Sequence, residues 1–77
     1  MTWEELKEKA TKELGYKYIK ERGVAQLYKD FVSCRINFIE TSGNVVVDIK
    51  FPTITYGGIL CERISADNMY QIMLALR

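Results

Sequence analysis

The 77-residue sequence predicts a single α+β domain over residues 1–77, in which N- and C-terminal helices pack on one face of a three-stranded antiparallel meander. Three observations support this prediction. A helical pattern of hydrophobic residues opens the chain, two stretches of alternating hydrophobic residues meet near Gly43, and a second helical pattern closes the chain. The expected element order is α-(α)-β-β-β-α, a two-layer sandwich.

The first helix is expected over residues 2–14. Thr2 is followed three residues later by Glu5, which is the spacing of a capping box. Gly15 follows where a left-handed residue commonly ends a helix. The hydrophobic stripe of this helix consists of Trp3, Leu6, Ala10 and Leu14.

Residues 16–31 are predicted to contain a short second helix. Hydrophobic residues at helical spacing favour a helix over residues 24–30; they are Val24, Leu27, Tyr28 and Phe31. Gly23 interrupts the pattern, so residues 16–22 are expected to form an irregular or helical link. The alternative is an extended stretch over residues 16–19.

From Val32 the hydrophobic period changes to two, which predicts a β-hairpin. The alternating residues are Val32, Cys34, Ile36 and Phe38, then Val45, Val47, Ile49 and Phe51. The turn is Ser42-Gly43 or Gly43-Asn44, so the numbers of paired residues add to 85 or 87. The opposite face then carries Ser33, Arg35, Asn37, Ile39, Val46, Asp48 and Lys50. Its two apolar residues, Ile39 and Val46, are expected to lie close together.

The last two elements are a third strand and a final helix. The strand is expected over residues 54–63, with a bulge, bend or tight turn at Gly57-Gly58. Either Ile59 and Cys61 or Leu60 and Ile64 face inward in this strand. The helix is expected over residues 66–77, with Ser65 as its N-cap. Its stripe consists of Met69, Ile72, Met73 and Leu76.

Composition excludes several classes of protein. Eleven basic residues against ten acidic ones give a net charge of +1, which does not predict strong attraction to nucleic acid or to an anionic membrane. The chain has no histidine and only two cysteines, too few ligands for the usual structural zinc site. No stretch is long and apolar enough to cross a membrane. We expect a cytoplasmic protein with free thiols, no metal and no cofactor.

The residue set does not favour an enzyme. Without histidine, the candidate nucleophiles are Cys34 and Cys61. By alternation Cys34 faces the core, and Cys61 precedes Glu62, whose charge disfavours a thiolate. Both thiols are therefore interpreted as small buried hydrophobic residues.

Nucleic-acid binding is the alternative function. The order α-β-β-β-α resembles the double-stranded RNA-binding domain, a family with a lysine cluster at the start of its last helix. This sequence departs from that pattern, because Ser65-Ala66-Asp67-Asn68 occupies the position. A nucleic-acid surface would instead use cations interleaved with tyrosines. These cations are Lys17, Lys20, Arg22 and Lys29.

The preferred hypothesis is a non-enzymatic module that binds another protein. Tyrosine and arginine are favoured at the centres of protein interfaces, and an open sheet face offers a docking patch. The candidate contact residues are Tyr16, Tyr18, Arg22 and Tyr28 on the segment before the hairpin, or Arg35, Ile39, Val46 and Lys50 on the sheet face. An inhibitor, adaptor or accessory protein of a phage or mobile element would fit this size. Homodimerisation is compatible with the hypothesis.

Overall fold

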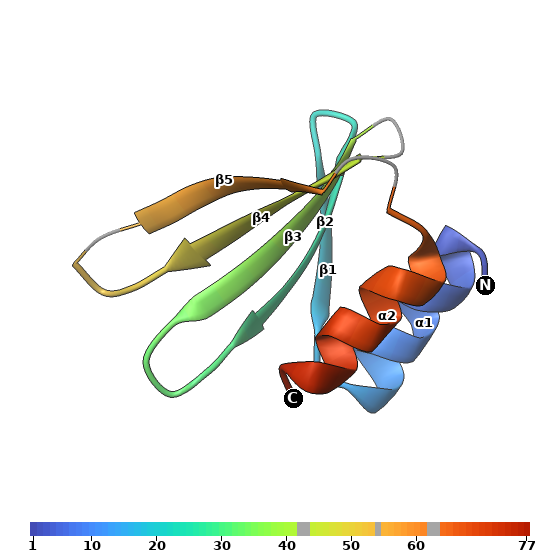
Figure 1. Cartoon of the computed structure of the whole chain (residues 1–77), viewed down its shortest axis with the longest axis horizontal. Coiled ribbons are helices and arrows are strands. Elements are labelled where there is room, and N and C mark those ends of the chain that lie inside the picture. The colour runs from blue at the N-terminus through green and yellow to red at the C-terminus, as the bar shows by residue number, and fades with distance from the viewer. Residues whose placement is uncertain (42–43, 54, 62–63) are drawn as a thin grey trace.

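The computed structural model describes the chain apart from residues 42–43, 54 and 62–63, and the backbone alone over 55–61. Over the described residues, two helices and a five-stranded antiparallel sheet make up the fold (Figure 1). The elements in chain order are α1 (Trp3–Glu13), β1 (Lys17–Glu21), β2 (Val24–Asp30), β3 (Arg35–Thr41), β4 (Asn44–Lys50), β5 (Thr55–Cys61) and α2 (Ala66–Ala75). The strands lie side by side in chain order. The α+β class is confirmed, and the prediction of three strands is wrong.

The additional strands come from the segment between α1 and the predicted hairpin. The predicted helix over 24–30 is instead strand β2, and β1 replaces the predicted link over 16–22. A two-residue turn, Arg22-Gly23, joins the paired residues Glu21 and Val24. Its φ angles are 52° and 78°, and two left-handed residues in succession match the twist of a tight hairpin. The extended alternative over 16–19 was therefore the better one, and the five-strand order departs from that of the double-stranded RNA-binding domain.

The predicted hairpin is confirmed as β3 and β4. Pairing runs from Arg35 with Lys50 to Thr41 with Asn44, so the paired numbers add to 85, as a turn at residues 42–43 predicts. Those two turn residues lie outside the described residues. The first strand begins later than expected: the amide of Phe31 donates to the carbonyl of Cys34 at 2.7 Å. Because residues 31–34 form a turn, Val32 is fully exposed rather than buried.

The predicted third strand is β5, at one edge of the sheet. Val47 of β4 pairs with Ile59, whereas Ile49 pairs with Tyr56. Three steps along β5 therefore match two steps along β4, which is the signature of a bulge around Gly57-Gly58. This confirms the bulge among the three alternatives. The inward or outward direction of the side chains in 54–63 lies outside what the structure describes.

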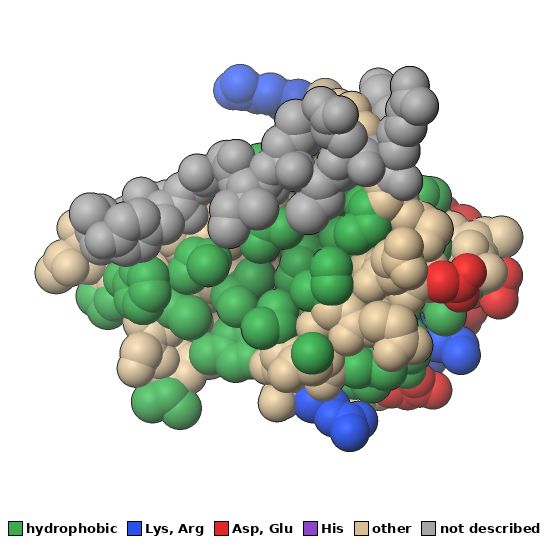
Figure 2. Space-filling model, in the orientation of Figure 1, with side chains coloured by type: hydrophobic (Ala, Val, Ile, Leu, Met, Phe, Trp, Pro, Cys, Tyr) green, Lys and Arg blue, Asp and Glu red, His purple; other side chains and the backbone are tan. Residues whose placement is uncertain are grey.

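Both helices cover the same face of the sheet, which we call the inner face (Figure 1). The core joins residues of α1 and α2 to inward-facing residues of the strands: Leu6, Ala10, Leu14, Tyr16, Leu27, Ile36, Phe38, Val45, Ala66, Met69 and Met73. Two of the four residues of the expected α2 stripe, Met69 and Met73, are completely buried as predicted. The other two, Ile72 and Leu76, are each 37% exposed. Figure 2 shows hydrophobic side chains gathered beside α2 and toward the strands.

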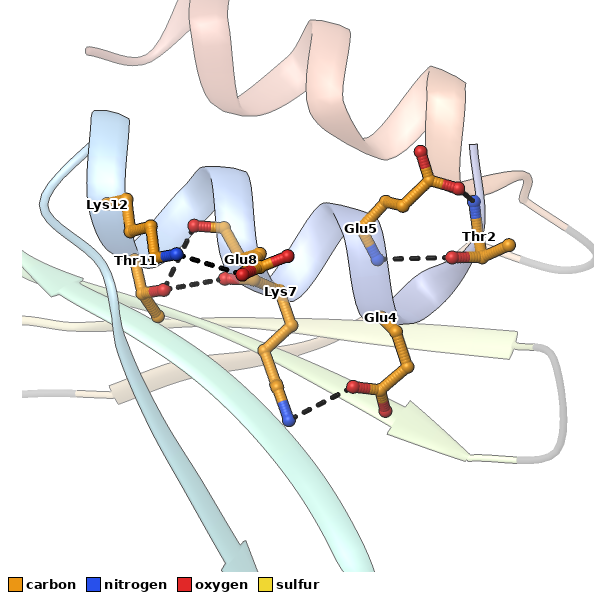
Figure 3. A network of polar contacts seen from close by, with 7 residues as sticks. All are labelled: Thr2, Glu4, Glu5, Lys7, Glu8, Thr11 and Lys12. Atoms are coloured by element: carbon orange, nitrogen blue, oxygen red, sulfur yellow. Dashed lines mark hydrogen bonds and ion pairs between the residues drawn. The ribbon is translucent and has the colours of Figure 1, made fainter.

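The start of α1 has the predicted capping box (Figure 3). The Glu5 amide donates to the Thr2 hydroxyl at 3.1 Å, and the Thr2 amide donates to the Glu5 carboxylate at 3.2 Å. Two amides that the first turn leaves without helical partners are thereby satisfied. Gly15 has a φ of 76°, which confirms the predicted left-handed position after the helix and turns the chain into β1.

Thr2→Ala is expected to lower the free energy of unfolding by about 1 kcal/mol, because it removes the hydroxyl that caps α1. Thr11→Ala is the matched control in the same helix. Its hydroxyl donates to the Lys7 carbonyl, which already accepts within a helix, so the variant should be as stable as the wild type or slightly more so. Urea titration followed by circular dichroism measures both. Equal losses in the two variants would contradict the capping role.

Candidate functional site

The structure brings five of the eight predicted contact residues onto one surface, the face of the sheet opposite the helices. We call this surface the outer face. Alternation along the paired strands places there Tyr28 of β2, Arg35 and Ile39 of β3, and Val46 and Lys50 of β4.

The other three predicted contact residues lie elsewhere. Tyr16 is a core residue, 3% exposed, with its ring centroid 5.8 Å from that of Phe38. Tyr18 is on the inner face, where the Lys7 ammonium lies 4.5 Å from its ring centroid. Arg22 is in the β1–β2 turn. Tyr16 is therefore removed from the candidate site, and the single surface predicted for these tyrosines does not form.

An apolar row crosses the outer face from β1 to β4. Successive cross-strand partners in this row are Ile19, Gln26, Ile39 and Val46, and Leu60 of β5 continues the register. The four residues from β1 to β4 are each half-buried. The expected closeness of Ile39 and Val46 is confirmed, because they are direct partners. Directly opposed apolar side chains stabilise a sheet and also leave a band of hydrophobic surface on it.

A second row, parallel to the first, centres on a buried amide. Its members are Lys17, Tyr28, Asn37 and Asp48. Asn37 is 6% exposed, and its Nδ2 donates to Gln26 Oε1 at 2.8 Å. Its Oδ1 is buried and accepts no hydrogen bond from the described residues. A buried acceptor without a hydrogen bond lowers the stability of the fold, and a hydrogen bond from a donor outside the chain would offset this loss.

The third row is charged and consists of Asp30, Arg35 and Lys50. The Arg35 guanidinium donates to the Asp30 carboxylate from Nε at 2.6 Å and from Nη2 at 3.1 Å. This hydrogen bonding is the main cause that lowers the pKa of Asp30 and raises that of Arg35. The guanidinium also lies over the Tyr28 ring, 4.6 Å from its centroid. Tyr28, Asp30 and Arg35 thus form one ordered group.

The cations predicted for nucleic-acid binding do not share a face. Lys17 is on the outer face, whereas Lys20 and Lys29 are on the inner face and Arg22 is in a turn. The Lys29 ammonium lies 5.5 Å from the Phe31 ring centroid and 5.8 Å from that of Tyr16. This arrangement lacks the continuous basic stripe that tracks a phosphate backbone.

A cavity of about 220 Å³ lies between α1 and the inner face. Its floor is apolar and includes Leu27 and Phe38, while Glu4 and Lys7 stand at its side in an ion pair of 3.3 Å. The volume is below the roughly 300–1,000 Å³ of common small-molecule sites. Its charged side chains are of both signs, so the cavity does not specify a ligand charge.

Within the described residues, no group of three or more histidine, cysteine or acidic side chains is placed to hold a metal ion. Cys34 is half-buried with a free thiol. In the described part of the chain, neither helix has the length and apolar character needed to span a bilayer.

Comparison with known proteins gives no relative. No family model, no curated protein and no solved structure matches the chain.

Sequence reasoning missed three residues of the outer face as contact candidates. Asn37 was assigned to this face but not to the site, and Ile19 and Gln26 were assigned to a link and a helix. The signal that would have found them is Arg22-Gly23, a two-residue turn with glycine at its second position. Pairing β1 with β2 across that turn completes the apolar row.

Proposed function

We propose that this chain is a non-enzymatic protein-binding module that acts through the outer face of its sheet. The observation that carries the proposal is the apolar row, in which Ile19, Ile39 and Val46 are half-buried on a face that neither helix covers. Apolar surface at the middle of an otherwise polar face is a common feature of docking sites.

The polar groups beside this row support the same function. Tyr28 and Arg35 are residue types that contribute strongly to protein interfaces, and here each is held in place by the other and by Asp30. Holding a contact residue in place before binding reduces the entropy that binding costs. An inhibitor or an adaptor needs no more than such a surface.

Charge on the outer face favours a protein partner over nucleic acid. Among the described residues, three cations and three acidic groups lie on it: Lys17, Arg35 and Lys50, and Glu21, Asp30 and Asp48. Protein interfaces pair charges of both signs, whereas a surface for phosphates carries an excess of cations.

A photo-crosslinking experiment tests this proposal. A benzophenone amino acid replaces Tyr28 on the outer face, and in a matched control it replaces Tyr18 on the inner face. The full chain is irradiated in a nuclease-treated lysate of the cells in which it naturally occurs. We expect covalent adducts to a protein from position 28 and few from position 18. Adducts to nucleic acid without nuclease, or equal yields from the two positions, would contradict the proposal.

A further inference from the structure

We propose that the protein bound by the outer face is a second copy of this chain, packed face to face about a two-fold axis close to the direction of β3. This inference rests on the proposed function, because it names the occupant of the same surface. Sheets packed face to face keep their strands within about 30° of each other, so the central rows of the two copies lie opposite one another. Such an axis exchanges β2 of one copy with β4 of the other.

The charged row is complementary to itself under this exchange. Asp30 of β2 and Lys50 of β4 flank Arg35 in the same row, so the axis places Asp30 of each copy opposite Lys50 of the other. Lys50 takes part in none of the ion pairs among the described residues. Arg35 lies close to the axis and therefore faces Arg35 of the second copy. The charge of each Arg35 is already balanced by Asp30 of the same chain, at 2.6 Å. The described residues of the outer face carry equal numbers of opposite charges, so these groups give no net repulsion between two copies.

The amide row supplies the hydrogen bonds at the axis. Asn37 is in the middle strand, so it faces Asn37 of the second copy. Its Nδ2 gives one N–H to Gln26 and has a second N–H to donate, while its Oδ1 has no donor among the described residues. Two such amides are complementary to each other, since each donates to the Oδ1 of the other.

The spacing of packed sheets suits this amide pair. Sheets pack about 10 Å apart and a hydrogen bond spans about 2.9 Å, which leaves about 3.5 Å for each asparagine side chain. Surrounding side chains cover Oδ1 in the single copy, so association includes their rearrangement. The same axis brings Ile39 of one copy against Ile39 of the other and removes the apolar row from water.

The size of the face sets the expected strength of the dimer. Five strands about 4.8 Å apart, four of them seven residues long and β1 five, outline at most roughly 24 by 24 Å. That area is slightly below what a standard interface buries on each partner. We therefore expect a reversible dimer whose monomer is populated on dilution.

Sedimentation equilibrium of the full chain tests the inference between about 1 and 500 µM. The wild type should change from monomer to dimer mass over this range. Lys50→Glu places two acidic groups opposite each other at two symmetric positions, and should raise the dissociation constant at least about tenfold. Within the monomer this glutamate is the cross-strand partner of Arg35, so the fold keeps a favourable contact there. Circular dichroism verifies that the fold is retained.

Two further variants separate the dimer contact from a general effect of charge. Asp30→Lys combined with Lys50→Glu reverses both charges and should restore the dissociation constant to within about threefold of the wild type. Arg35 retains an acidic cross-strand neighbour in this double variant. Lys20→Glu makes the same change in net charge on the inner face and should leave association unaffected.

A wild type that stays monomeric at every concentration overturns the second-copy inference, and so does a dimer that Lys50→Glu leaves intact. Failure of this inference is distinguishable from failure of the proposed function. If the wild type is monomeric and position 28 crosslinks to a different protein, the dimer inference is contradicted and the proposed docking face is supported. If the wild type is monomeric and position 28 gives no protein adducts, both the dimer inference and the proposed function are contradicted.

Discussion

Phe38→Ala is expected to lower the free energy of unfolding by about 3–5 kcal/mol, the largest effect of any single change considered for this chain. Phe38 is 3% exposed at the centre of the inner face, between its cross-strand partners Leu27 and Val47. Its ring also packs on that of Tyr16 at 5.8 Å. Removing it leaves a cavity between the sheet and the helices that cover it.

The consequence is severe because the domain is small. A 77-residue chain has a total stability of roughly 4–12 kcal/mol, so the loss removes much of it. Urea titration followed by the fluorescence of Trp3, the single tryptophan, measures the change. Val32→Ala is the control, because Val32 is fully exposed and should alter stability by less than about 0.5 kcal/mol. Similar midpoints for Phe38→Ala and the wild type would contradict the described core.

The second large effect is a loss of stability at alkaline pH that depends on Tyr16. Burial raises the pKa of the Tyr16 phenol from its ordinary value near 10 to about 12. Between these two values the unfolded chain releases the Tyr16 proton and the folded chain keeps it. The Tyr16 contribution to stability is therefore complete below pH 10 and is lost as the pH rises toward 12, by about 2 kcal/mol.

Tyr16→Phe should remove this part of the alkaline dependence and leave the rest unchanged. The Tyr16 hydroxyl is buried and has no hydrogen-bond partner among the described residues, so the variant should also gain about 1 kcal/mol at neutral pH. Urea titrations of both proteins at pH 7, 10 and 11 measure the difference. A wild type and a variant whose stabilities fall in parallel above pH 10 would show that the phenol is not buried.

The two ends of the chain and the β3–β4 hairpin could be predicted because local and tertiary signals agree there. Thr2 and Glu5 form the capping box that their spacing predicts, and Ser65 caps α2 through the amide of Asn68. In the hairpin, alternation on each side of the turn places Arg35 and Lys50 on one face in either predicted register, and the observed pairing is one of those two. Each pattern specifies one structure without help from the rest of the fold.

Strand β2 could not be predicted from its hydrophobic spacing. Val24, Leu27 and Tyr28 have helical spacing, yet Leu27 faces the core and Tyr28 faces outward. The alternating pattern is hidden in the sequence because one inner-face position carries a lysine, Lys29, where an apolar residue would be expected. Lys29 is accommodated there because its ammonium extends over two aromatic rings. Pairing with both neighbours determines the conformation of this central strand, and pairing with distant residues is not visible in a local pattern.

The candidate site was predictable to the extent that it lies on the hairpin. Arg35, Ile39, Val46 and Lys50 share the outer face, as both predicted hairpin registers require. Tyr28 also lies on the outer face, but it belongs to β2, a strand that was not predicted. The burial of Asn37 results from the neighbouring strands that surround it, and only the assembled sheet shows that its Oδ1 has no donor within the described part of the chain.

Lysine footprinting tests most directly whether the outer face is the working surface. Lys50 on the outer face and Lys20 on the inner face are both exposed strand residues. The full chain is acetylated briefly in host lysate at its native abundance and, separately, after purification and dilution. We expect acetylation of Lys50 to slow in the lysate relative to dilute protein while that of Lys20 is unchanged. Equal rates at Lys50 in the two conditions would contradict the proposal that a protein covers this face.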